Sequence, residues 1–93
     1  MTIPLAKFSA AMQALPLVAI LRGLTPAEAP AVGDALVEVG FPLLEVPLNS
    51  PQPLESIALL RQRFPQALVG AGTVLDPQQV RAVQGAGGEL IVA

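Results

Sequence analysis

The chain has 93 residues, enough for one small domain, and five basic against seven acidic residues give it a net charge of −2. Hydrophobic residues make up 53% and charged residues 13%, a balance that excludes an intrinsically disordered chain. The basic residues are scattered, so no nucleic-acid partner is expected. The sequence has no cysteine or histidine, which excludes disulfides and thiolate metal sites.

The amino-terminal segment shows no targeting signal. The first fifteen residues carry a single charged residue, Lys7, and no small-residue cleavage site follows them. No apolar run is long enough to span a bilayer, so no membrane partner is predicted and the cytoplasm is the expected compartment. The chain is nevertheless very apolar for its length, so we expect it either to expose apolar surface or to pack against further protein.

A helix is expected over residues 4–14, with Lys7 on its solvent-exposed surface. After this helix the sequence repeats one unit, a short apolar strand followed by an amphipathic helix. The expected strands are residues 17–21, 43–48, 67–74 and 89–93.

The three helices between these strands share one kind of start. Thr25, Ser50 and Asp76 each precede a proline, which predicts an N-cap residue followed by proline in the first turn. These starts are 25 and 26 residues apart. Apolar residues then recur with helical spacing: Val32, Leu36 and Val39; Leu54, Ile57, Leu60 and Phe64; Val80 and Val83. Gly40 and Gly87 follow two of the helices, where glycine caps are expected.

Continuous apolar strands that alternate with amphipathic helices indicate a parallel sheet covered by helices. Units of this length suit a compact (β/α) barrel, whose full form needs roughly 200–250 residues. The sequence therefore predicts an α/β fold, the N-terminal half of a (β/α)8 TIM barrel. It would hold about four parallel strands and three crossover helices after a short helix, within one partial domain over residues 1–93.

Three polar residues fall near the carboxyl ends of the predicted strands, where barrels gather their functional groups. They are Arg22, Glu45 and Thr73. Strand side chains alternate, so one shared parity would point all three into the barrel interior. In the third strand that parity includes Val69 and Ala71. The glycines beside Thr73, at positions 70 and 72, would let a ligand approach the backbone.

Each of these residues also has a structural interpretation. Arg22 could be a solvated loop charge, Glu45 its structural ion-pair partner, and Thr73 an ordinary strand residue. Asn49 and Ser50 fit turn and cap positions better than ligands. The charged residues of the helices fit solvated faces: Glu55, Arg61, Arg63 and Arg81.

Three motifs in order resemble one enzyme family. They are Ala19-Ile20-Leu21-Arg22-Gly23, then Gly40-Phe41-Pro42-Leu43-Leu44-Glu45-Val46-Pro47-Leu48-Asn49-Ser50-Pro51, then Gly70-Ala71-Gly72-Thr73-Val74-Leu75. Together they resemble the 2-keto-3-deoxy-6-phosphogluconate and 6-phosphogalactonate aldolases over residues 16–93. The family's commoner form has threonine and arginine where this chain has Pro47 and Asn49, which favours the phosphogalactonate branch.

The resemblance implies a (β/α)8 barrel that assembles as a trimer and needs no metal or cofactor. Its reaction would be class I aldol cleavage of a phosphorylated keto sugar acid to pyruvate and glyceraldehyde 3-phosphate, through a Schiff base on a lysine. Glu45 would be the general acid and base, Arg22 would hold the substrate carboxylate, and Thr73 would bond the pyruvyl end. Gly72 and Asn49 would complete the substrate site, with Asn49 unable to supply the charge of the commoner arginine.

In the family the Schiff-base lysine is on strand six and the phosphate site is built from the last strands. Neither position falls within this chain, and Lys7 matches no family motif. The resemblance therefore implies an amino-terminal fragment that is inactive alone. Three alternatives stay open: the phosphogluconate-specific aldolase, another barrel enzyme for phosphorylated sugars such as a decarboxylase or epimerase, and a non-catalytic half-barrel or assembly module.

Overall fold

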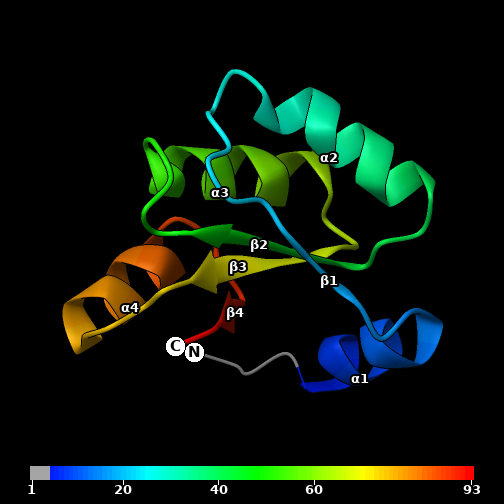
Figure 1. Cartoon of the computed structure of the whole chain (residues 1–93). Helices are drawn as coiled ribbons and strands as arrows, with labels where there is room; N and C mark the ends of the chain where they lie inside the picture. The colour runs from blue at the N-terminus through cyan, green and yellow to red at the C-terminus, as the bar shows by residue number, and fades with distance from the viewer. Residues whose placement is uncertain (1–4) are drawn as a thin grey trace.

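A computed structural model describes residues 5–93 and contains one sheet of four parallel strands alternating with four helices (Figure 1). The strand order β1-β2-β3-β4 follows the chain, as in consecutive βα units of a barrel. The elements are α1 (Leu5–Ala14), β1 (Val18–Ile20), α2 (Ala29–Glu38), β2 (Leu43–Pro47), α3 (Pro53–Arg63), β3 (Leu68–Gly72), α4 (Pro77–Gly85) and β4 (Leu90–Ile91).

The two faces of the sheet are covered differently. Helices α2 and α3 lie over one face in Figure 1, and Val83 of α4 belongs to the same core cluster. On the opposite face, Ala11 of α1 packs on Leu43 and Leu68 at the amino-terminal ends of the strands. The second face corresponds to the interior of a barrel, and α1 closes its amino-terminal end.

All four expected strands are present, with shorter bounds than the apolar runs that predicted them. The fourth strand covers only Leu90–Ile91, although its pairing with β3 continues beyond it. Val92 donates its N–H to the carbonyl of Ala71 at 2.8 Å, and Val74 donates to the carbonyl of Val92 at 3.2 Å. The expected first helix matches α1, except that residue 4 lies outside the described residues.

The three predicted N-caps have different outcomes. Asp76 is confirmed, because its carboxylate accepts the N–H of Gln79 at 2.9 Å. Thr25 exchanges hydrogen bonds with Glu28, yet α2 begins only at Ala29. The prediction for Ser50 is wrong: α3 begins at Pro53, after Gln52 in a left-handed conformation. The Ser50 hydroxyl lies in a buried position instead and bonds another loop, as described below.

Three apolar positions of the predicted helix faces are exposed. Val39 is 71% exposed because α2 ends at Glu38, Leu54 of α3 is 37% exposed and Val80 of α4 is 38% exposed. The glycine caps are confirmed, since Gly40 and Gly87 both have positive φ angles.

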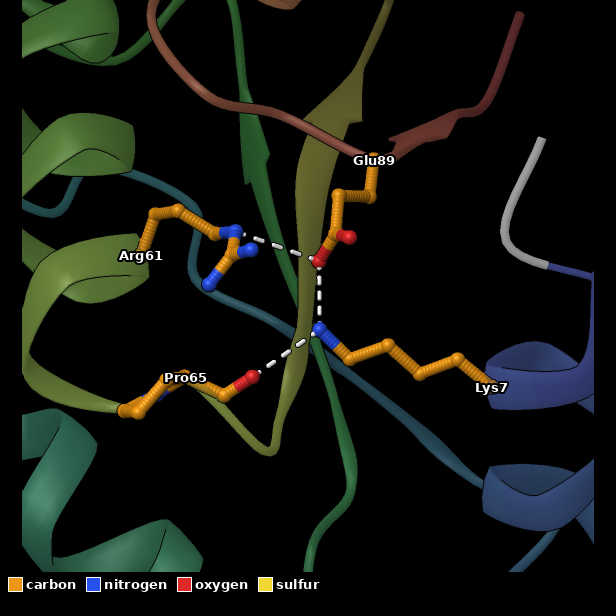
Figure 2. Close-up of polar contacts among 4 residues, drawn as sticks. All are labelled: Lys7, Arg61, Pro65 and Glu89. Carbon is orange, nitrogen blue, oxygen red and sulfur yellow. Dashed lines mark hydrogen bonds and ion pairs between the residues drawn. The ribbon is translucent and has the colours of Figure 1, made fainter. Parts of the chain in front are cut away.

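Lys7 belongs to a charged cluster and is not an unpaired surface lysine (Figure 2). Its Nζ lies 2.6 Å from Glu89 Oε1 and donates to the carbonyl of Pro65 at 3.1 Å. Arg61 Nε lies 3.3 Å from the same Glu89 oxygen. The cluster ties α1 to α3 and to the start of β4, so Lys7 is held at the amino-terminal end of the sheet.

Arg61 departs from the expectation of a solvated helix charge, because it is partly buried and pairs in this cluster, whereas Arg63 is exposed as expected and also makes an ion pair. Two guanidinium nitrogens of Arg63 donate to the two carboxylate oxygens of Asp34, at 2.9 and 2.7 Å. This exposed pair joins α3 to α2.

Gly33 lets α2 approach α3 closely. A Cβ at this position would overlap the ring of Phe64 and the side chain of Leu60. Gly33→Ala gains about 1 kcal/mol of helix propensity but overpacks the interface, which typically costs about 1–3 kcal/mol. We expect the free energy of unfolding in urea to fall by about 1 kcal/mol.

Gly85→Ala is the matched control, because no atom lies within 4 Å of the added Cβ at the end of α4. Its stability should stay the same or rise by up to about 1 kcal/mol. Equal losses in both variants would contradict the packing explanation.

Candidate active site

A cavity of about 490 Å³ lies at the carboxyl ends of the strands. Its lining comprises Ile20, Arg22, Glu45, Pro47, Asn49, Thr73, Leu75, Val92 and Ala93. Four of the five residues predicted for the site therefore meet in one volume, although they come from three different strand ends. The charged cluster around Lys7 lies at the opposite end of the sheet.

Glu45 is the buried carboxylate of this cavity. It lies in the middle of β2, where it is 4% exposed, and its Oε2 atom has no hydrogen-bond partner among residues 5–93. Burial raises the pKa of the Glu45 carboxyl above its ordinary 4.5, because desolvation penalises the charged form. Within the described residues no ion pair joins Glu45 to Arg22, so the structural ion-pair interpretation is wrong.

Gly72 provides the space that the Glu45 side chain occupies. A Cβ at Gly72 would overlap both carboxylate oxygens and the Cδ atom of Glu45. Gly70 has another role: a Cβ there would overlap the backbone carbonyl of Leu90, so this glycine permits β4 to pair closely. Gly72 thus makes room for the Glu45 carboxylate, whereas Gly70 allows β3 and β4 to pair closely.

Thr73 lines the cavity because of its backbone conformation and not, as predicted, because of strand alternation. Val69 and Ala71 were expected to face the interior with Thr73, and this is wrong, because both belong to the helix-side core. In β3 the residues paired with Leu43, Glu45 and Pro47 are Leu68, Gly70 and Gly72. Thr73 follows the strand with a φ of +58°, and this left-handed backbone interrupts the alternation. Such a conformation is rare for a β-branched residue and is typical of functional sites.

Arg22 lies in a tight turn after β1. The turn is closed by the Leu24 N–H, which donates to the carbonyl of Leu21 at 3.2 Å, and Gly23 has a φ of +80°. Arg22 is exposed, and no described residue makes an ion pair with it. Its guanidinium is thus available for an anion.

Asn49 occupies the corresponding turn after β2, where it is exposed on the cavity wall. Its neighbour Ser50 donates its N–H to the carbonyl of Pro47 at 3.0 Å and is buried. From its sequence position, Ser50 was expected to fit a turn or helix cap better than a ligand site.

Within residues 5–93, no three acidic, histidine or cysteine side chains are grouped closely enough to bind a metal ion. No helix in that part of the chain has the length and apolar composition needed to cross a bilayer.

We expect the contribution of the buried Glu45 carboxyl to the free energy of unfolding to fall as the pH rises. Because the pKa of Glu45 is raised by folding, the unfolded chain loses this proton first, and ionisation then destabilises the folded state. The contribution is lost as the pH rises from about 4.5 through the folded-state pKa. Glu45→Gln stays neutral, so its free energy of unfolding should increase relative to the wild type over this range.

Comparison of the two chains by urea unfolding, from below pH 4.5 to neutral pH, measures this difference. Glu28 and Asp34 have lowered pKa values, through hydrogen bonds from Thr25 and Arg63, and contribute with the opposite sign. They are present in both chains and cancel. A difference that does not vary with pH would show that Glu45 ionises normally.

Known proteins share this arrangement of strands and loops. The model of the family "KDPG and KHG aldolase" matches residues 8–93. The 2-dehydro-3-deoxy-6-phosphogalactonate aldolase of Escherichia coli strain K12 is 52% identical over 79 residues, which are 84% of this chain and 38% of the relative. A solved structure described as native KDPGal is 51% identical with a TM-score of 0.80, and the match covers 83% of this chain and 38% of that one.

A more distant solved structure has the same fold. It is the KDPG aldolase of Legionella pneumophila with pyruvate captured as a covalent carbinolamine intermediate. It is 33% identical with a TM-score of 0.80, over 97% of this chain and 42% of that one. The four-stranded unit is thus a partial half-barrel, and the chain spans 38% of the length of its E. coli relative. Since the family match covers residues 8–93, which include every strand and the positions of Arg22, Glu45 and Thr73, the chain belongs to the KDPG and KHG aldolase family.

Proposed function

We propose that residues 1–93 form the proton-transfer and carboxylate-binding part of a class I aldolase. The reaction is cleavage of 2-dehydro-3-deoxy-6-phosphogalactonate to pyruvate and glyceraldehyde 3-phosphate. The observation that carries this proposal is the Glu45 carboxyl, buried with no hydrogen-bond partner for Oε2 among residues 5–93, on a cavity that Arg22 and Thr73 also line.

Glu45 suits the proton transfers of such a reaction. Addition of an amine to a keto carbon, loss of water from the carbinolamine and cleavage of the C–C bond each require a proton to be delivered or removed. A general acid and base works best when its pKa lies near the operating pH, and burial moves the Glu45 carboxyl in that direction. Its unpartnered Oε2 is free to bond a substrate hydroxyl or a water molecule.

The neighbouring residues would bind the substrate. The Arg22 guanidinium can hold the carboxylate of the pyruvyl end, because it is exposed and unpaired within residues 5–93. Thr73 would donate its hydroxyl to the same end. Asn49 would contact the sugar chain with a neutral amide, which leaves Arg22 as the cationic group of the cavity lining.

The nucleophile must come from elsewhere. Lys7 is the single lysine of the sequence, and its ammonium group is paired with Glu89 at the end of the sheet opposite the cavity. A Schiff base needs a lysine at the keto carbon whose pKa is lowered by its surroundings. We therefore propose that residues 1–93 do not catalyse cleavage without a lysine from the remaining barrel strands.

The galactonate substrate is favoured over the gluconate epimer. The support is the 52% identity to the E. coli phosphogalactonate aldolase, against 40% to the 2-dehydro-3-deoxy-phosphogluconate aldolase of Dickeya dadantii. We also propose that the complete enzyme acts in the cytoplasm as a homo-oligomer, a trimer as the family resemblance implies, and that its small-molecule partners are the keto sugar acid and pyruvate.

The test uses a completed barrel, in which residues 1–93 are joined to the segment of the E. coli relative that follows the matched region. Pyruvate release is measured with the galactonate and gluconate substrates. We expect the completed barrel to release pyruvate from the phosphogalactonate substrate, with a higher kcat/KM than from the phosphogluconate epimer. We expect the 93-residue chain to release no pyruvate from either substrate. A folded completed barrel that releases no pyruvate from either substrate would favour a non-catalytic module.

A further inference from the structure

Ser50 links the two loops that carry the proposed substrate-binding residues. Its hydroxyl oxygen accepts the backbone N–H of Gly23 at 3.1 Å, although the two residues are 27 positions apart. The side chain is fixed by its surroundings, because Ser50 is 6% exposed and its own N–H donates to the carbonyl of Pro47. Ser50 does not line the cavity, so any effect on a ligand must pass through another residue.

The bonded N–H belongs to the peptide unit between Arg22 and Gly23. These two are the central residues of the turn closed by Leu24 and Leu21, and the positive φ of Gly23 is that of a type II turn. In a type I turn the same peptide plane is rotated by about 180°, and its N–H points the other way. A hydrogen bond to the Gly23 N–H therefore favours the type II form.

Arg22 is held on both sides by β2 and the loop that follows it. The preceding residue, Leu21, donates its N–H to the carbonyl of Glu45 at 2.8 Å, and the following residue, Gly23, donates to Ser50. The Arg22 side chain itself makes no hydrogen bond or ion pair with residues 5–93. Its direction over the cavity is thus set chiefly by its backbone.

We propose that Ser50 is a positioning residue that acts through Arg22. By holding the Arg22–Gly23 peptide, the Ser50 hydroxyl directs the guanidinium toward the substrate carboxylate. This inference rests on the proposed function for the role of Arg22, whereas the bond itself can be tested independently.

The first experiment measures amide hydrogen exchange in the 93-residue chain. Ser50→Ala should speed exchange of the Gly23 amide by about tenfold, the equivalent of one lost hydrogen bond, and leave the Leu21 amide unchanged. Ser56→Ala is the matched control, because Ser56 is fully buried on α3 and its hydroxyl has no partner among the described residues. It should leave both amides unchanged. An unaltered Gly23 amide in Ser50→Ala would overturn the inference.

The second experiment measures steady-state kinetics of the completed barrel. Ser50→Ala should raise KM by about tenfold and change kcat by less than about threefold, while Ser50→Thr, which keeps the hydroxyl, should stay near the wild type. In an Arg22→Ala background, Ser50→Ala should raise KM no further, because its effect passes through the arginine.

Additive effects of Ser50→Ala and Arg22→Ala on KM would overturn the positioning role, as would an equal loss in Ser56→Ala. A completed barrel with native Ser50 that releases no pyruvate would refute the proposed function instead. The Gly23 exchange result would then still decide whether Ser50 holds the turn.

Discussion

Replacement of Glu45 by glutamine is expected to lower kcat of the completed barrel by about 10²–10⁴-fold, the usual contribution of a general acid and base. The amide has nearly the shape of the carboxyl but cannot accept and return a proton. KM should change little, because Arg22 is the residue proposed to bind the substrate carboxylate. The measurement is the initial rate of pyruvate release at saturating substrate.

The same variant supplies its own control for folding. Since Glu45 is buried and its Oε2 has no partner in the described part of the chain, the glutamine variant should be at least as stable as the wild type at neutral pH. A stable variant that retains more than about a tenth of the wild-type kcat would remove Glu45 from the proton transfers.

Gly72→Ala is expected to cause a loss of similar size, although it adds only a methyl group. The added Cβ would lie where the Glu45 carboxylate lies, and β3 cannot shift easily because it is an inner strand that pairs with both β2 and β4. The carboxylate must move instead, and a displacement of about 1 Å can cost about 10²-fold in rate. Kinetics of the completed barrel measure the loss, with Gly85→Ala as the substitution into open space.

A double variant separates two roles of Gly72. Gly72 could act only by leaving space for the Glu45 carboxylate, which we call its seating role. In that case Gly72→Ala should reduce kcat by less than about threefold in a Glu45→Gln background, because the carboxylate is already absent. If Gly72 contacts the substrate directly, as the family resemblance implies, the two losses should multiply. Multiplicative losses would refute the seating role.

The fold could be predicted to a large extent, because the signals that specify it are local. Two signals repeat at nearly constant spacing: an apolar run, beginning near Val18, Leu43 and Leu68, and a proline after each turn. Together they indicate consecutive βα units. Element ends were less accurate. Ser50 has the side chain of an N-cap residue, but its hydroxyl accepts a hydrogen bond from Gly23, a partner that cap statistics do not include.

The site was predicted in part. Glu45 was identifiable because a carboxylate within an apolar strand costs free energy unless it is paired or becomes protonated, so its presence indicates a specific role. The face of the sheet on which each β3 residue lies was not predicted correctly. That prediction depended on regular alternation up to Thr73, and the left-handed conformation of Thr73 breaks this alternation. The contact between Gly72 and Glu45 joins the neighbouring strands β3 and β2. It depends on the register of these strands, which cannot be read from the local sequence pattern. The pairing of Lys7 with Glu89 likewise depends on how α1 docks.

Reductive trapping with pyruvate and borohydride, followed by intact mass, tests the central claim most directly. The claim is that residues 1–93 supply the acid–base and carboxylate-binding groups of a Schiff-base aldolase but not its nucleophile. The account predicts one pyruvyl adduct on the completed barrel and none on the 93-residue chain. An adduct on the 93-residue chain, on Lys7 or the terminal amine, would contradict the missing nucleophile, and no adduct on the completed barrel would contradict the aldolase itself.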